Sequence, residues 1–595
     1  GIQTPLGGVH VDIWTENIFR PIVSKINKKY KSKFTITDIL KYFTIFVVTE
    51  INNPTFTTQS KEKLSSPRVD DMTLPDSIRD KIMKWEFMED IKETVDSKKY
   101  IALKKTDGKK SKHVKVDGYD RANKSGGTLS TTCSLILSEG LSAKTYAVEG
   151  IGSCGLDGRK GRDWFGIYAL RGKTLNVTNA TPSQIEDNKV LSDIRKIMGL
   201  KYGTDYSEDT NYRSLNYGRI IILCDADHDG NHIKGLIINF LVAMYPSLVK
   251  RAGFLTSIET PIAKVSCRGG TTKLFYDISK YNKFQEENKN QIKSVKYYKG
   301  LGASTKTEIK ETFGRYVIHY ITDTDTKKYL RLAFCKTQSD SRKQWLSSYI
   351  HSVEDDTKTP SHDSPDRVNT LDISTFIDKT LIMYSLEDCG RSIPNIWDGL
   401  KESQRKILYS IIKKNLDHTS STMKVAQLAG YVAEQSGYHH GENNLIDTLI
   451  KMAQNFPGKN NISYLYKDGQ FGSRICAGKD AANGRYIFTR LTSIFYKIFR
   501  KEDFGIYEYI NDDGMYVEPT HYVPIIPMIL VNGINAAIGT GWSCTVPNYN
   551  PMDIVAWIRE WWNFSSKKNS VKVTLKPWYK NFKGEIKMEG DRITT

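Results

Sequence analysis

The chain has 595 residues, more than one hydrophobic core normally serves, which predicts about three to five domains. Hydrophobic residues make up 39% and aromatic residues 11% of the chain, a content that excludes a largely disordered protein. With 86 basic and 67 acidic residues the net charge is +19, which favours a polyanionic partner such as nucleic acid over a merely soluble basic protein.

The cysteines and the apolar stretches limit the environments in which the chain can work. Eight scattered cysteines form no CxxC pair and no zinc-finger spacing with His, which predicts reduced cysteines and an intracellular protein. The most apolar stretch, residues 523–539, contains two prolines, two asparagines and two glycines. We therefore expect neither a membrane span nor a membrane partner.

The N-terminal part begins with a predicted helix. Residues 10–30 carry apolar residues at helical spacing and end in lysines, as helix C-termini favour. A polar stretch at 58–72 predicts a junction, and the lysine-rich stretch at 98–115 predicts either a solvated basic face or a DNA contact. The chain starts at Gly1 and stops within a strand-like segment, so we expect further sequence beyond both ends.

From about residue 128, short apolar runs alternate with helical patterns. The runs at 133–140 and 218–230 and the helical pattern at 231–245 predict an α/β domain with a mainly parallel sheet. Residues 352–369 combine Pro, Ser and mixed charge without a period, which predicts a flexible linker.

Two amphipathic helices are predicted after this linker, at 399–415 and 424–436. In the second, Val425, Leu428 and Val432 share one face, so that face is expected in a core while Lys424 can point outward. Two helices with a short connection fit a helix-turn-helix or winged-helix module, or an ordinary helical hairpin.

Four acidic residues follow two of the apolar runs. Asp225, Asp227 and Asp229 occupy every second position after one run, and Glu139 ends another. In parallel sheets the catalytic and ligand-binding residues lie at the carboxyl ends of the strands. Several carboxylates close together there require a divalent cation to neutralise their charge. An EF-hand is excluded because loop position twelve would be Leu236 instead of Glu, whereas a surface acidic turn stays an alternative.

These motifs resemble those of a known family. EGLSAK (139–144) and DADHDG (225–230) are similar to the TOPRIM signatures, and 163–177 and 297–305 resemble the RGKxLNV and YKGLG motifs of type II DNA topoisomerases. The resemblance implies a two-metal Mg²⁺ site at Glu139, Asp225, Asp227 and Asp229, acid–base work by Glu139, and a DNA contact by Lys299. Leu141 stands where this family usually has an acidic residue, and we expect this difference to affect only the fine tuning of the site.

Downstream segments resemble the winged-helix cleavage domain of eukaryotic-type topoisomerase II. Residues 391–409, 424–442 and 469–491 follow in the family order. The resemblance makes Tyr486 the nucleophile beside Arg485, which can hold the phosphate where charge develops. It also implies catalytic or DNA-binding roles for a further set of residues: Arg405, Lys406, Lys424, His439 and His440. The alternatives are purely structural roles: an inward-facing aromatic side chain at Tyr486 and a turn at the two histidines.

Two further residue groups are assigned by weaker resemblance. The segment 518–542 is similar to a family motif that places a DNA-intercalating isoleucine at Ile538, with a core isoleucine as the alternative. The segment 53–64 resembles the transducer loop that reaches ATP, which maps to Gln59 and Lys61.

The resemblance covers essentially the whole chain and implies an α/β plus α+β multidomain fold. The expected domains are an ATPase transducer tail (1–66), a linker with the start of the cleavage core (67–127), a Rossmann-like TOPRIM domain (128–365), a winged-helix domain (366–517) and the start of a tower domain (518–595). The implied activity is that of an ATP-dependent type IIA DNA topoisomerase, which cleaves both strands of DNA through a 5′-phosphotyrosyl bond, passes a second duplex and religates.

The same resemblance implies Mg²⁺ and ATP as cofactors, double-stranded DNA as substrate and a homodimer, because one nucleophile per chain cannot cut two strands. A single chain holding both motif sets fits the eukaryotic or large-DNA-virus layout and leans towards a viral enzyme. The expected location is the host cytoplasm for a viral protein and the nucleus for a cellular one. A TOPRIM nuclease or primase, and a DNA-binding scaffold with a dead site, are the competing hypotheses.

Overall fold

The structure is a computed structural model that describes residues 2, 4, 6–30, 34–57, 61–67, 74–85, 87–88, 91, 114–298, 300–352, 368–438, 440–512, 514–564, 574–589 and 592–594. Most of the linker predicted at 352–369 and most of the lysine-rich stretch lie outside these residues, as do Gln59, Lys299 and His439. In the described part no helix combines the length and apolarity that a membrane span requires.

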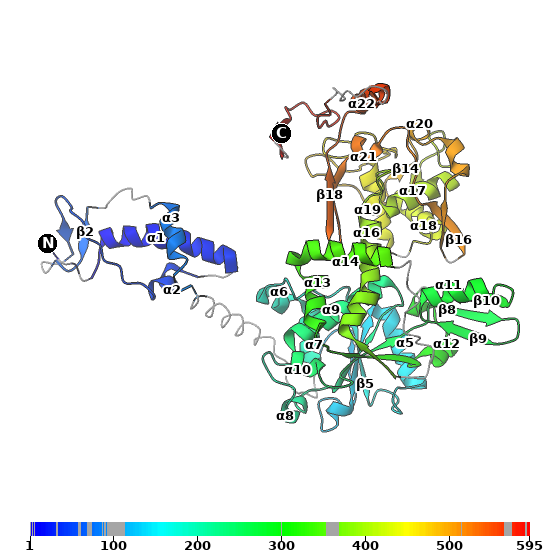
Figure 1. The fold of residues 1–595 in the computed structure, drawn as a ribbon, viewed down its shortest axis with the longest axis horizontal. Coiled ribbons are helices and arrows are strands. Elements are labelled where there is room, and N and C mark those ends of the chain that lie inside the picture. The colour runs from blue at the N-terminus through cyan, green and yellow to red at the C-terminus, as the bar shows by residue number, and fades with distance from the viewer. Residues whose placement is uncertain are drawn as a thin grey trace.

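The N-terminal part forms a small helical unit, drawn in blue in Figure 1. Helix α1 (Val9–Tyr30) confirms the helix predicted at 10–30 and ends in Lys28 and Lys29. Phe19, Ile22 and Ile26 of this helix pack in a core with residues of the segments that follow. Its other elements are α2 (Ile36–Leu40), α3 (Asp76–Ile82) and the strands β1 (Thr55–Phe56) and β2 (Leu64–Ser66).

A seven-stranded sheet with the order β12-β11-β7-β6-β4-β5-β3 forms the centre of the next unit. Its strands are β3 (Tyr119–Asp120), β4 (Ser134–Glu139), β5 (Phe165–Leu170), β6 (Arg219–Leu223), β7 (Leu255–Glu259), β11 (Tyr316–Ile321) and β12 (Val368–Asp372). The inner strands β5, β4, β6 and β7 are parallel neighbours, whereas β3 and β11 run antiparallel to β5 and β7. The predicted α/β fold with a mainly parallel sheet is confirmed.

Helices cover both faces of this sheet, which explains the unbroken apolar runs of its strands (Figure 1). Leu135 and Leu137 of β4 pack in one core, and Ile136 between them packs in the core of the opposite face. A strand buried on both faces has no polar side to alternate with. The covering helices include α5 (Gly140–Ser153), α7 (Lys189–Met198) and α9 (His228–Met244).

The two edge strands of the sheet lie outside the range predicted for the domain. Strand β3 comes from the range predicted as a linker with the start of the cleavage core, and β12 comes from residues predicted to open the winged-helix domain. The predicted boundaries 128 and 365 therefore cut through one hydrogen-bonded sheet, because short edge strands carry little apolar signal in the sequence.

Smaller elements surround the sheet. A three-stranded antiparallel sheet of β8 (Ala263–Cys267), β9 (Thr272–Phe275) and β10 (Ile292–Tyr297) packs on α11 (Ile278–Glu287). The remaining helices of this unit are α6 (Pro182–Asp187), α8 (Asp209–Tyr212), α10 (Pro246–Val249), α12 (Lys306–Thr312), α13 (Thr326–Phe334) and α14 (Ser339–Ser352).

The C-terminal part is a mainly helical unit with its own core. Helix α16 (Ile382–Ser392) leads into it after the short helix α15 (Ile373–Thr375). The two predicted helices are observed as α17 (Glu402–Lys413) and α18 (Val425–Gln435), and the predicted apolar face of α18 is buried. Further helices are α19 (Glu442–Ala453), α20 (Phe495–Ile498), α21 (Met528–Val531) and α22 (Pro551–Phe564).

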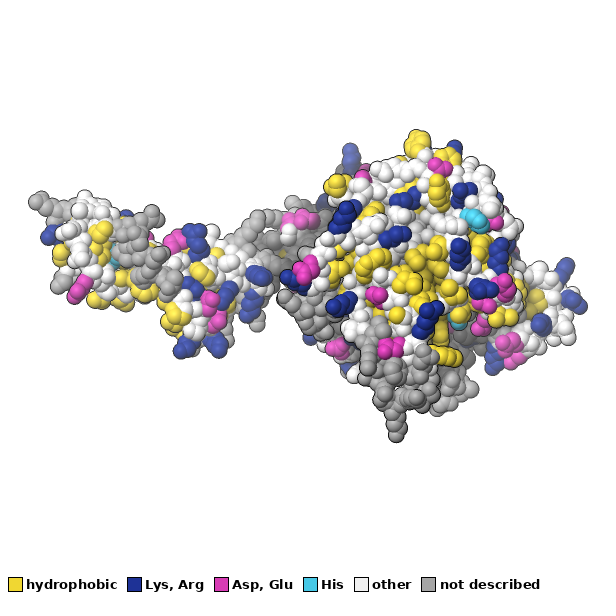
Figure 2. All heavy atoms as spheres, turned by 90° about the horizontal axis from the view of Figure 1, so that it is seen from above, with side chains coloured by type: hydrophobic (Ala, Val, Ile, Leu, Met, Phe, Trp, Pro, Cys, Tyr) yellow, Lys and Arg dark blue, Asp and Glu magenta, His cyan; other side chains and the backbone are white. Residues whose placement is uncertain are grey.

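Short antiparallel strand pairs complete this part. They are β13 (Met423–Lys424) with β14 (Phe488–Thr489), β15 (Tyr509–Asp512) with β16 (Met515–Pro519), β17 (Ile534–Gly539) with β18 (Trp542–Val546), and β19 (Lys587–Glu589) with β20 (Arg592–Thr594). Figure 2 shows one face of the molecule, on which Lys and Arg side chains are spread among apolar ones.

Candidate active site

Glu139 and Asp225 meet at one edge of the seven-stranded sheet. Strands β4 and β6 are parallel neighbours, so their carboxyl ends lie together, and Glu139 ends β4 while Asp225 follows β6. The backbone N–H of Asp225 donates to Glu139 Oε2 at 3.2 Å. Asp227 caps the start of α9, where its side chain accepts from the N–H of Gly230 at 2.6 Å. We call Glu139, Asp225, Asp227 and Asp229 the acid site.

Burial and mutual repulsion perturb the acids at this edge. Burial, followed by the charges of Asp227 and Asp225, raises the pKa of Glu139 to about 7. Burial also raises the pKa of Asp225, opposed by a hydrogen bond of 2.8 Å from the N–H of Leu301. Leu301 lies in the predicted YKGLG motif, so that motif contacts the acid site through its backbone. Groups with such perturbed pKa values are typical of functional sites.

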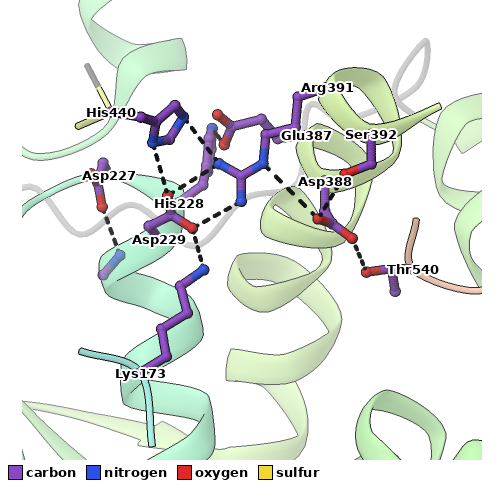
Figure 3. A network of polar contacts seen from close by, with 11 residues as sticks. Lys173, Asp227, His228, Asp229, Glu387, Asp388, Arg391, Ser392, His440 and Thr540 are labelled. Atoms are coloured by element: carbon purple, nitrogen blue, oxygen red, sulfur yellow. Dashed lines mark hydrogen bonds and ion pairs between the residues drawn. The ribbon is translucent and has the colours of Figure 1, made fainter. Parts of the chain in front are cut away.

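Asp229 already has cationic partners within the chain (Figure 3). Lys173 Nζ lies 2.5 Å from Asp229 Oδ1, and the two terminal nitrogens of Arg391 lie 3.0 and 3.1 Å from its two oxygens. Burial would raise the pKa of Asp229, but the hydrogen bonds from Arg391 and Lys173 outweigh it and hold that pKa well below its usual range. His440 Nδ1 is 3.9 Å from Asp229 Oδ2, and His440 Nε2 is 3.4 Å from Arg391.

The donor chemistry of the acid site fits Mg²⁺, which prefers carboxylate oxygens and keeps several of its waters. Burial and the nearby charges of Asp227 and Asp225 disfavour the ionised form of Glu139, and a bound divalent cation would favour it. Among the described residues, however, no group of three or more His, Cys, Asp or Glu side chains is already arranged to hold a metal. A cation would thus draw the carboxylates closer, and at Asp229 it would compete with Lys173 and Arg391.

Tyr486 is on the surface of the C-terminal unit, with 74% of the residue exposed. This excludes the alternative of an inward-facing aromatic. Two residues before Tyr486, the backbone at Gly484 passes close to Ile446, since a Cβ at this position would lie 2.9 Å from Ile446 Cγ2. Lys424 is exposed and pairs in register with Phe488, so β13 and β14 bring its segment beside that of Tyr486.

Arg405 and Lys406, which the resemblance assigns to DNA binding, are buried and form ion pairs within the chain. Arg405 is 6% exposed and its Nε lies 2.9 Å from Asp398 Oδ2. Lys406 is also 6% exposed, lies 2.9 Å from Glu518 Oε1 and donates to the carbonyl of Ser436. Both cations therefore have partners inside the core of the C-terminal unit.

The other predicted residues are dispersed over the described structure. Ile538 is 71% exposed on β17, which excludes a core isoleucine there. Lys61 is exposed in the N-terminal unit. Arg485 follows Asn483, whose side-chain oxygen accepts its backbone N–H at 3.1 Å.

Two residues of the site were not singled out from the sequence. Lys173 belongs to the RGK part of the motif at 163–177, and Arg391 is the first residue of the motif at 391–409. Both motifs were recognised, but nothing in the sequence indicated that the two cations converge on Asp229.

Comparison with known proteins shows what the parts of the chain are similar to. Family models match it in three ranges: DNA gyrase B over residues 1–115, the C-terminal associated domain of TOPRIM over 258–389, and the A subunit of DNA gyrase/topoisomerase IV over 391–595. DNA topoisomerase 2 of Invertebrate iridescent virus 6 is 41% identical over 99% of this chain and 53% of its own length. DNA topoisomerase 2 of Saccharomyces cerevisiae is 42% identical over 98% of this chain and 40% of its own length.

Two further comparisons add a human relative and a solved structure. Human DNA topoisomerase 2-alpha is 40% identical over 98% of this chain and 38% of its own length. The crystal structure of the Plasmodium falciparum topoisomerase II DNA-binding, cleavage and re-ligation domain matches with a TM-score of 0.66 at 41% identity, covering 81% of this chain and 63% of that one. The chain spans about half or less of the length of these curated relatives.

Proposed function

We propose that this chain, as a member of the type IIA DNA topoisomerase family, carries out the DNA cleavage and religation of an ATP-dependent type II topoisomerase. The strongest support is that the chain holds both an exposed tyrosine in the predicted cleavage motif and a separate cluster of carboxylates at a sheet edge. A nuclease that uses a water nucleophile would need the carboxylates but not the tyrosine.

In the proposed reaction the phenol oxygen of Tyr486 attacks a backbone phosphorus, and the bond from phosphorus to the 3′ oxygen breaks. A phosphotyrosyl bond to the 5′ end forms, the phenol proton leaves, and a free 3′ hydroxyl is produced. Religation reverses these steps, so the energy of the phosphodiester bond is retained. Arg485 would place its donors on the phosphate where negative charge develops.

The acid site supplies the second half of the chemistry. Mg²⁺ bound there would stabilise the attacking and leaving oxygens as a Lewis acid. Glu139, Asp225 and Asp227 are the proposed ligands, with Asp229 joining them if its partners Lys173 and Arg391 give way. Glu139 is also the proposed proton acceptor and donor for the 3′ oxygen.

Double-stranded DNA and a second copy of the chain are the proposed partners. Lys424, His439, His440 and Lys299 are the proposed phosphate contacts, and exposed Ile538 is the proposed wedge between base pairs. In the part of the chain that the structure describes, no contact joins Tyr486 to the acid site. A homodimer in which each tyrosine works with the acids of the partner chain is therefore consistent with the geometry.

The finer assignments follow the same proposal. We assign the seven-stranded sheet to a TOPRIM domain, the C-terminal helical unit to a winged-helix domain, residues 518–595 to the start of a tower domain, and the N-terminal unit to the end of an ATPase transducer. Gln59 and Lys61 are the proposed ATP contacts. The proposed location is the host cytoplasm for a viral protein and the nucleus for a cellular one.

Trapping of the protein on DNA tests the proposed function. The chain is incubated with circular duplex DNA and Mg²⁺, denatured rapidly, and analysed for protein joined to 5′ ends. We expect an adduct that Tyr486→Phe abolishes while duplex binding stays unchanged. Nicked DNA without an adduct would instead support a nuclease, and neither adduct nor nicks would support a non-catalytic DNA-binding scaffold. A matched control is Tyr516→Phe, which alters another exposed tyrosine.

A further inference from the structure

Helix α16 contacts both the acid site and the β17–β18 hairpin (Figure 3). Near its end, Arg391 binds both oxygens of Asp229 at 3.0 and 3.1 Å. One turn earlier on the same helix, Asp388 Oδ2 accepts a hydrogen bond of 2.8 Å from Thr540 Oγ1 in the hairpin turn. Asp388 Oδ1 also lies 3.9 Å from Arg391 Nε. A single carboxylate thus connects the arginine of the acid site with the hairpin.

The turn of the hairpin lies against α16 with little free space. The Cys389 thiol donates to the carbonyl of Thr540 at 3.2 Å. A Cβ added at Gly539 would lie 3.1 Å from Cys389 Cα, so the hairpin backbone approaches the helix as closely as a glycine permits. Ile538, adjacent to this contact, is exposed. A shift of α16 would therefore move the backbone that carries Ile538.

We propose that Asp388 is a positioning residue that couples the acid site to the β17–β18 hairpin, so that Mg²⁺ at the acids and the insertion of Ile538 into duplex DNA assist each other. The inference rests on the proposed function. Once a cation takes Asp229 away from Arg391, that arginine still has His440 Nε2 at 3.4 Å and the carboxylate of Asp388 at 3.9 Å. Because Asp388 also holds Thr540, the change at the acid site reaches the hairpin through this carboxylate.

The coupling is measurable as an effect of Mg²⁺ on DNA bending. All proteins carry Tyr486→Phe to prevent cleavage, and a duplex with a fluorophore at each end reports bending by energy transfer. The coupling is the ratio of the protein concentrations that give half-maximal bending without and with Mg²⁺. Thermodynamic linkage requires that DNA change the dissociation constant of Mg²⁺ by the same ratio. We expect a ratio of about five or more in the parent protein, which carries Tyr486→Phe alone.

Three substitutions and a control test the role of the carboxylate. Asp388→Ala and Thr540→Val should each lower the ratio to about one, and the double variant should lower it no further, because both changes remove the same link. Thr540→Ser keeps the hydroxyl and should keep the ratio. Asp447→Ala, which removes an exposed carboxylate on α19, should leave the ratio unchanged.

Several results would overturn the inference. They are a parent protein whose bending ignores Mg²⁺, an Asp388→Ala variant with the parental ratio, and losses that multiply in the double variant. Should Asp388→Ala fail to fold, the comparison of Thr540→Val with Thr540→Ser decides alone. If the protein with native Tyr486 forms adducts but the parent protein shows no coupling, only this inference is contradicted. If the protein with native Tyr486 forms no adduct, the proposed function is contradicted.

Discussion

Substitution of Glu139 by glutamine should stabilise the metal-free protein at alkaline pH. The pKa of Glu139 rises from an ordinary value of 4.5 to about 7 because the carboxyl is buried beside Asp227 and Asp225. The folded protein therefore binds this proton more tightly than the unfolded chain does. The resulting stabilisation is complete below pH 4.5 and is lost as the pH rises through about 7.

The size of the effect follows from the same shift. It corresponds to about 3 kcal/mol of unfolding free energy at pH 8, or roughly 6–12 °C in Tm for a domain of this size. We expect Glu139→Gln and the native protein to unfold together at pH 4 in EDTA, and the variant to be the more stable at pH 8. Mg²⁺ should then stabilise the native protein at pH 8 more than the variant, because binding to the folded state adds stability.

Thermal unfolding by calorimetry or circular dichroism across this pH range measures the difference between the two proteins. Titrating groups away from the acid site cancel in that difference, and Glu286→Gln, which replaces an exposed glutamate on α11, controls for the loss of one acid. Equal stability of Glu139→Gln and the native protein at pH 8 in EDTA would refute the argument, because it would mean that neither burial nor the neighbouring carboxylates disfavour the ionised form of Glu139.

Three further substitutions separate buried from exposed residues. Arg405→Ala should destabilise folding by about 3–5 kcal/mol in denaturant unfolding, because it leaves the buried Asp398 without its cation; a loss below about 1 kcal/mol would contradict the buried pair. Lys424→Ala should leave stability within about 0.5 kcal/mol but lower the salt slope of DNA binding by about 1, and an unchanged slope would exclude a phosphate contact. Ile538→Ala should reduce DNA bending without a change in Tm, and parental bending would exclude the wedge.

The sequence determined the parts of this protein that depend on local patterns. Apolar runs buried on both faces indicated the parallel strands β4 and β6, and the acids that follow them were expected at one edge of the sheet. Helical periodicity placed α1, α17 and α18 nearly to their observed ends. Motifs alone singled out Tyr486, whose exposure agrees with a surface role.

The tertiary structure alone decided which charged side chains are free and which are paired. Arg405 and Lys406 have the chemistry of phosphate ligands, but Asp398 and the distant Glu518 neutralise them within the core. Asp229 was expected to be free for a metal, yet it binds Arg391, which is 162 positions away in the chain. Periodicity reports which face of an element is apolar, whereas the partner of a charge is set by how separate elements pack, so these pairings could not be predicted from local sequence.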